Sequence, residues 1–290
     1  MNLDRKTDFV SVIIPCYNHG SYIHEAIDSV LEQTYDNIEI IVVNDGSNDQ
    51  RTNEILLSID KPKTRVFHKE NGGPSSARNF GIGKSAGEFI LTLDSDDKFA
   101  PTFLEKAVKI LKENPETGMV TSYHLRFGEH RKTEKNKLTG GSVTDLLTVN
   151  NAVACLLYRY QCWVDAGGYD EDIPGFEDWE FNINVTKQGW TIYSIPEYLF
   201  YYRDVKGSGL DRHQMKRPEI IKYMVEKHRD LYQQNIVDVI YKKDRKIKEL
   251  NEMITRQHNS YAYKLGNLLL RPLRFLKSLP RTREHTILQN

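Results

Sequence analysis

Apolar and polar positions follow two alternating rhythms over the first hundred residues. Short apolar runs rich in β-branched residues predict buried strands, at residues 9–15, 38–43, 64–68 and 89–93. Apolar residues at helical spacing lie between them and after them, at residues 22–33, 52–59, 75–84 and 101–113. Strands separated by helices predict an α/β fold with a mainly parallel sheet and right-handed crossovers.

The pattern changes twice further along the chain. Strand-like segments at 119–123, 153–158, 191–195 and 198–202 surround a helix near 179–188. Residues 220–263 contain almost no Gly or Pro, and their apolar residues come close to a heptad repeat. This region predicts a long helix, a helical hairpin or a weak coiled coil, which would offer a contact to a second copy of the chain.

Polar or glycine-rich turns follow three of the predicted strands, at 44–47, 71–74 and 94–97. Ligands of parallel sheets bind at the carboxyl ends of the strands. We therefore expect the three turns to converge on one rim of the sheet.

Composition excludes several classes of protein. No apolar run approaches the roughly 20 residues of a membrane span, and 10% aromatic content argues against disorder. Forty basic and forty acidic residues cancel, which gives no support for nucleic-acid binding. The three cysteines show no C-x-x-C spacing, so neither a disulfide framework nor a zinc site is expected. With no secretory signal at the N-terminus, we expect a cytoplasmic protein.

The neutral total hides a basic tail. Residues 260–290 hold six Lys or Arg and one acid, a net +5, so the rest of the chain carries −5. Leucines and aromatic residues alternate with the basic residues over 260–283, which is typical of a segment lying on an anionic membrane surface. Packing of this tail on the rest of the protein, or a subunit contact, is the alternative.

Asp94-Ser95-Asp96 is the sharpest chemical signal, because it follows an apolar strand. Two carboxylates at such a turn can face one rim, and hard oxygen ligands suit Mg²⁺ or Mn²⁺. A cation held there would neutralise a diphosphate leaving group. The alternative is a solvated acidic turn or a cap before the helix that Pro101 opens.

Five segments taken together resemble glycosyltransferase family 2, the GT-A fold enzymes that use nucleotide-diphosphate sugars. They lie at residues 10–35, 38–49, 71–82, 87–97 and 167–181. Their order and spacing fit the family across about residues 9–205. The resemblance implies a GT-A domain over 1–205, with a nucleotide-sugar half at about 9–115 and an acceptor half at about 116–205. Residues 206–290 would form a helical extension.

The resemblance implies a set of donor-site residues. The turn at Pro15 and Tyr17 is similar to the family's nucleotide-base loop, where an aromatic face stacks on a base. Asp45 would accept a hydrogen bond from the base, and Arg78 would bind the nucleotide. Without the resemblance these residues are an ordinary surface Tyr, an Asx-turn and a helix Arg.

The same resemblance divides the Asp94-Ser95-Asp96 motif between two roles. It implies that Asp96 binds the metal, Mg²⁺ or Mn²⁺, and that Asp94 lies nearer the ribose. Asp97 is a weaker candidate. Many relatives have Tyr-Arg-x-His after the last strand, but here Tyr202-Arg203-Asp204 is followed by Val205. His213 is the substitute that the sequence suggests for that histidine, although an ordinary surface histidine is the favoured alternative.

Glu177-Asp178 resembles the family's acceptor-site motif. A hydroxyl is a poor nucleophile, so a carboxylate should take its proton as the new bond forms. Asp178 is the expected base, with Glu177, Trp179 and Gly168 on the acceptor side. From the residues alone, a capped helix start with acids at its positive end explains the motif better than catalysis does.

The resemblance implies an inverting glycosyltransferase that moves a sugar from a nucleotide-diphosphate donor, UDP by default, to a glycan or lipid-linked acceptor. It is expected to act in cell-surface polysaccharide synthesis at the inner face of the plasma membrane. Two alternatives stay open. One is a catalytically silent partner that binds nucleotide sugars, and the other is a nucleotidyltransferase, although the chain lacks the Gly-rich loop of that class.

Overall fold

The computed structural model describes residues 5–128, 134–205 and 215–278, with side chains up to residue 270. It divides into two compact units, Met1–Ile236 and Val237–Asn290. The first unit extends beyond residue 205, which the resemblance implies as the end of the GT-A domain.

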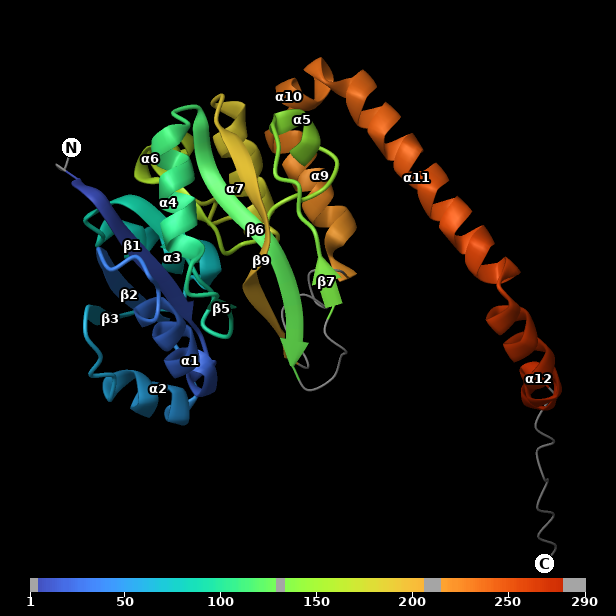
Figure 1. Cartoon of the computed structure of the whole chain (residues 1–290), viewed down its shortest axis with the longest axis horizontal. Coiled ribbons are helices and arrows are strands. Elements are labelled where there is room, and N and C mark those ends of the chain that lie inside the picture. Colours follow the sequence, from blue (N-terminus) through green and yellow to red (C-terminus); the bar gives the residue numbers. More distant parts are fainter. Residues whose placement is uncertain (1–4, 129–133, 206–214, 279–290) are drawn as a thin grey trace, which may run out of the picture. The chain divides into compact units, whose positions relative to one another are not determined.

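A nine-stranded mixed sheet organises the first unit (Figure 1). Its strands are β1 (Lys6–Cys16), β2 (Ile38–Asp45), β3 (Thr64–Lys69), β4 (Gly87–Thr92), β5 (Lys98–Phe99), β6 (Thr117–Gly128), β7 (Glu134–Asn136), β8 (Leu157–Arg159) and β9 (Thr191–Asp204). Their order is β3-β2-β1-β4-β8-β6-β9-β5, with β7 paired to β6. The block β3-β2-β1-β4 is parallel, as predicted. The antiparallel strand β8 joins it to the long parallel pair β6 and β9.

The described helices connect these strands and follow them. They are α1 (Gly20–Leu31), α2 (Gln50–Leu57), α3 (Gly73–Gly83), α4 (Phe103–Glu113), α5 (Val143–Leu146), α6 (Tyr160–Ala166), α7 (Glu177–Lys187), α9 (Arg217–Lys227), α10 (Arg229–Gln234), α11 (Ile236–Asn259) and α12 (Tyr261–Ser278).

Alternation along β1 sends its side chains to two different layers. Val12 and Ile14 belong to a core cluster with buried residues of α1 and α4. Ile13 faces the opposite side, where α3 comes so close that a Cβ at Gly81 would lie 2.6 Å from Ile13 Cγ2. Burial on both faces explains why β1 reads as an unbroken apolar run.

The structure corrects two strand predictions. The strand expected at 153–158 is confined to Leu157–Arg159. The two strands expected at 191–195 and 198–202 are one strand, β9. Pro196 lies where the pairing with β6 shifts register, between Ile195 and Tyr198, so its missing N–H does not end the strand.

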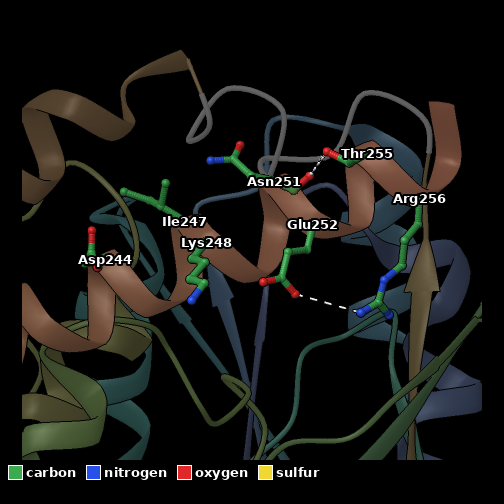
Figure 2. A pocket seen from close by; sticks show the side chains of 7 residues that line it. All are labelled: Asp244, Ile247, Lys248, Asn251, Glu252, Thr255 and Arg256. Carbon is green, nitrogen blue, oxygen red and sulfur yellow. Dashed lines mark hydrogen bonds and ion pairs between the residues drawn. The ribbon is translucent and has the colours of Figure 1, made fainter. Parts of the chain in front are cut away.

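The long helix predicted over 220–263 is interrupted at His228, Asn235 and Ser260. Helix α11 has no buried residue. Among the described helices of the chain, none is long and apolar enough to cross a membrane. Figure 2 shows seven side chains of α11 around a shallow depression, with a hydrogen bond from Thr255 to the Asn251 carbonyl. One helix supplies all seven, and none of them is a candidate site residue.

Candidate active site

The three predicted turns converge on one rim of the sheet. The first of them contains Asp45, the last residue of β2. Its carboxylate accepts hydrogen bonds from Lys69 Nζ at 2.7 Å and from the N–H groups of Gly72 and Gly73 at 3.1 and 2.8 Å. The turn before α3 is thereby fixed to the end of β2. A carboxylate has about four lone-pair sites, and these three donors occupy most of them on a residue that is 2% exposed.

The loop after β1 lies beside the loop after β2. Pro15 is the penultimate residue of β1, and Tyr17 beyond it is 44% exposed, which leaves its ring accessible to a ligand. Asn18, which has a φ of 59°, joins the two loops. Its side-chain amide donates to the Asn48 side-chain oxygen, and its own side-chain oxygen accepts the main-chain N–H groups of Asn48 and Asp49. Asn18 belongs to the turn that resembles the nucleotide-base loop, but the resemblance gives Asn18 itself no role.

Arg78 connects the Asp94-Ser95-Asp96 motif with the Glu177-Asp178 motif. Its guanidinium is buried and donates to Asp94 Oδ1 at 2.8 Å and to Glu177 Oε1 at 2.7 Å. Partial burial raises the pKa of Asp94, while the charge of Arg78 opposes that rise and Asp96 adds to it. The buried Arg78 Nε–H has no hydrogen-bond partner among the described residues. Two carboxylates thus already bind the Arg78 guanidinium, which the resemblance assigns to nucleotide binding.

The remaining acids of the turn face different ways. Asp96 Oδ2 lies 3.5 Å from His19 Nδ1, in the loop after β1. The hydrogen bond with Asp96 is the largest influence on His19 and raises its pKa. Asp97 is buried, and its Oδ1 accepts the N–H of Arg203 at 2.7 Å. Burial, and then the charges of Asp96 and Asp94, raise the pKa of Asp97 well above its usual range.

Two sets of donor atoms near this turn differ in how well they suit a divalent cation. Oxygens of Asp94 and Asp97 lie within 4.8 Å of the Cys155 sulfur and of each other. However, burial raises the pKa of the Cys155 thiol well above its usual range, and a protonated thiol is a poor ligand for Mg²⁺ or Mn²⁺. Asp96, whose side chain keeps 17% of its surface exposed, offers a carboxylate at the rim and fits such a cation.

Asp178 is held at the start of α7. Its Oδ2 accepts the amide of Asn150 at 2.7 Å, and the Asn150 oxygen in turn lies 3.3 Å from the Asn182 amide. Burial and the charge of Glu177 raise the pKa of Asp178 to about 6, although Arg78 and Asn150 oppose the rise. A carboxyl group of this pKa is ionised at neutral pH and can still accept a proton effectively.

Trp179 and Gly168 shape the surroundings of Asp178. Trp179 is 2% exposed and donates its indole N–H to the Leu146 carbonyl, so a direct sugar contact stays a prediction that its burial does not favour. Gly168 has a φ of 90°, and a Cβ there would lie 3.0 Å from Asn79 Oδ1. Asn79 bonds both the N–H and the carbonyl of Tyr169, which fixes this loop to α3.

The end of β9 lies directly against the acidic turn. Arg203 donates its Nε–H to the Asp96 carbonyl at 2.7 Å and its Nη2–H to Glu25 at 2.9 Å. Val205 follows two residues later, at the position where the resemblance to the family leads one to expect histidine. His213, the suggested substitute, lies outside the described residues.

Comparison with known proteins identifies the family of the chain. The family model "Glycosyl transferase family 2" matches residues 11–163, and the chain belongs to this family. Among similar proteins, the Bacillus subtilis uncharacterised glycosyltransferase EpsJ is 33% identical over 210 residues, which cover 67% of this chain and 61% of EpsJ. A Rickettsia felis uncharacterised glycosyltransferase is 48% identical over 118 residues, covering 40% of this chain.

The matches span limited parts of some relatives. The chain matches 20% of the Rickettsia felis protein and 26% of a Rickettsia bellii relative. Staphylococcus aureus TarS residues 1–349, solved with UDP-GlcNAc, superposes with a TM-score of 0.58 at 22% identity, over 70% of this chain and 60% of that one. This likeness confirms the GT-A fold.

Proposed function

We propose that the protein is an inverting glycosyltransferase that uses a UDP-sugar. The observation that carries the proposal is the bridge through Arg78, which brings the donor-side Asp94 and the acceptor-side Glu177 to one guanidinium. Asp178, next to Glu177, is then beside the donor motif. A solved complex of the structural relative TarS with UDP-GlcNAc supports uridine as the base.

The proposed reaction is a displacement at the anomeric carbon. An acceptor hydroxyl oxygen forms the new bond to that carbon while its proton passes to Asp178. The bond from the carbon to the donor diphosphate breaks, and UDP leaves with the electron pair. A divalent cation at Asp96, Mg²⁺ or Mn²⁺, would neutralise the developing charge on the diphosphate. Tyr17 stacks on the uracil and Asp45 accepts a hydrogen bond from it.

The experiment is a comparison of turnover and product stereochemistry. The wild-type chain is incubated with UDP-glucose, UDP-galactose and UDP-GlcNAc and with glycan or lipid-linked acceptors, and the anomeric configuration of the product is read by NMR. Asp178→Asn should lower transfer by at least ~10²-fold. Asp60→Asn, at an exposed position, is the matched control and should be normal. A retained configuration, or normal transfer by Asp178→Asn, would contradict the mechanism.

The C-terminal helices motivate two proposals about partners. Exposed apolar residues of α11, among them Ile240, Ile247 and Ile254, recur at seven-residue intervals and support self-association through 220–263. In α12, Leu265, Leu268 and Leu269 are exposed, which supports binding of the basic tail (residues 260–283) to anionic lipid. Such binding would place the enzyme beside lipid-linked acceptors of cell-surface polysaccharide synthesis.

A further inference from the structure

The three acids of the Asp94–Asp97 turn contact three different partners. Asp94 pairs with Arg78, and Asp97 accepts the main-chain N–H of Arg203. The carboxylate of Asp96 instead faces the imidazole of His19, 3.5 Å away. One carboxylate and one imidazole, from loops after the neighbouring strands β4 and β1, therefore meet at the rim of the sheet.

Main-chain contacts hold both residues in place independently of their mutual contact. The Asp96 carbonyl accepts the Nε–H of Arg203 at 2.7 Å. Next to His19, the Gly20 N–H donates to Thr52 Oγ1 at 3.0 Å, and a Cβ at Gly20 would lie 2.7 Å from Thr52 Cα. The loop thus runs close against α2 and fixes the position of His19. Both side chains stay accessible, at 38% exposed for His19 and 17% for Asp96.

The spacing of the two donor atoms suits a shared cation. Ligand atoms at about 2.1 Å from a cation lie roughly 3 to 3.5 Å apart when they are neighbours in its coordination sphere. We propose that His19 Nδ1 and Asp96 bind the same divalent cation, the one that carries the donor diphosphate. The inference deepens the proposed function and rests on it.

The chemistry of the pair sets the preferred ion. Mg²⁺ takes oxygen ligands almost exclusively, whereas imidazole is a good ligand for transition metals. His19 should therefore make the site prefer Mn²⁺ to Mg²⁺. A site with Asp96 as its protein ligand and no imidazole would show a smaller preference.

The test is nitrogen coordination to Mn²⁺ in the full-length chain. Mn²⁺ and UDP are bound to the wild type, and pulsed EPR measures the ¹⁴N coupling that a directly bound imidazole produces. Calorimetry measures the dissociation constants of UDP with Mn²⁺ and with Mg²⁺. Variants are His19→Ala, His213→Ala and, as a matched control, His24→Ala, because His24 is exposed one turn further along α1.

His19→Ala should lose the ¹⁴N coupling. It should also weaken Mn²⁺-dependent UDP binding by at least ~10-fold, because mutating even a residue that only orients a metal ligand lowers metal affinity by roughly that factor. Its Mg²⁺-dependent binding should change less, and its thermal unfolding should match the wild type. His24→Ala and His213→Ala should keep the coupling. Coupling that survives in His19→Ala, or disappears in His213→Ala, would overturn the proposal. A wild type that binds no nucleotide would instead overturn the proposed function.

Discussion

Arg78 and Glu177 are separated by 99 positions in the sequence, and their side chains form a buried ion pair of 2.7 Å. The same guanidinium holds Asp94. This relationship makes the donor motif and the acceptor motif one electrostatic unit. A change on either side alters the charge balance on the other, including the charges that act on Asp178.

The first prediction concerns the stability that Arg78 supplies. Arg78→Ala leaves the carboxylates of Asp94 and Glu177 without their shared cation, and breaking a buried pair costs about 3 kcal/mol or more. Urea unfolding measures the loss. Arg65→Ala is the control, because Arg65 is 51% exposed in its pair with Glu39 and should cost below about 1 kcal/mol. Equal losses in the two variants would show that Arg78 is not structurally special.

The second prediction is a pH profile governed by Asp178. The base acts when ionised, so the rate of transfer should fall as pH decreases through about 6, the pKa of Asp178. The Asn150 amide stabilises the ionised form and lowers this pKa. Asn150→Ala should therefore raise it and move the acid limb of the profile to higher pH. If the acid limb of the profile lies at the same pH in Asn150→Ala as in the wild type, Asp178 does not govern it.

The third prediction concerns the boundary of the catalytic unit. Glu180 of α7 is fully buried, and its Oε1 lies 2.8 Å from Lys227 Nζ and 2.9 Å from His228 Nε2. A chain that ends at Val205 lacks both partners, and the uncompensated charge should lower the melting temperature by about 10 °C. A chain that ends at Ile236 keeps both and should melt close to the wild type.

Point variants separate this charge effect from the loss of two helices. His228→Ala should destabilise the chain that ends at Ile236, because Glu180 Oε2 is already buried without a hydrogen-bond partner among the described residues. Lys222→Ala, at a position 76% exposed on the neighbouring helix α9, should have little effect. Equal melting temperatures for the chains ending at Val205 and Ile236 would refute the role given to α9 and α10.

The pattern of apolar residues predicted most of the parallel half of the sheet, and the reason is physical. Buried strands must be apolar on both faces, and the turns at their carboxyl ends must converge, so Asp45 and the turn before α3 could be placed together. The C-terminal helices were harder. Their polar residues form one continuous helix-favouring run, and nothing local reveals that His228 is buried against Glu180 of α7.

Much of the site could not be predicted from the sequence, for a similar reason. Asn150 and His19 are polar residues in loops, where no periodicity reports what they contact, and Asn79 is a polar residue within α3. Each acquires its position from a partner at least 28 residues away, as Asn150 does from Asp178. The resemblance to the family could name the motif residues, but the side chains that orient them became visible only in three dimensions.

The fourth prediction tests the basic tail (residues 260–283). The full-length chain should sediment with vesicles that contain anionic lipid and remain in solution with zwitterionic vesicles. A chain lacking residues 265–283 should bind neither, and added salt should release the full-length chain, because surface charges are screened. Equal sedimentation of the two chains would exclude the tail as the membrane contact.

The most direct test of the account is calorimetry of UDP, GDP, dTDP and CDP, each with Mn²⁺ and with EDTA. We predict that UDP binds with Mn²⁺, that binding disappears with EDTA or in Asp96→Ala, and that Asp178→Asn binds UDP normally while losing transfer. Failure of all four nucleotides to bind the wild type would contradict the donor site. Normal UDP binding by a wild type that transfers no sugar would instead favour the catalytically silent partner that binds nucleotide sugars.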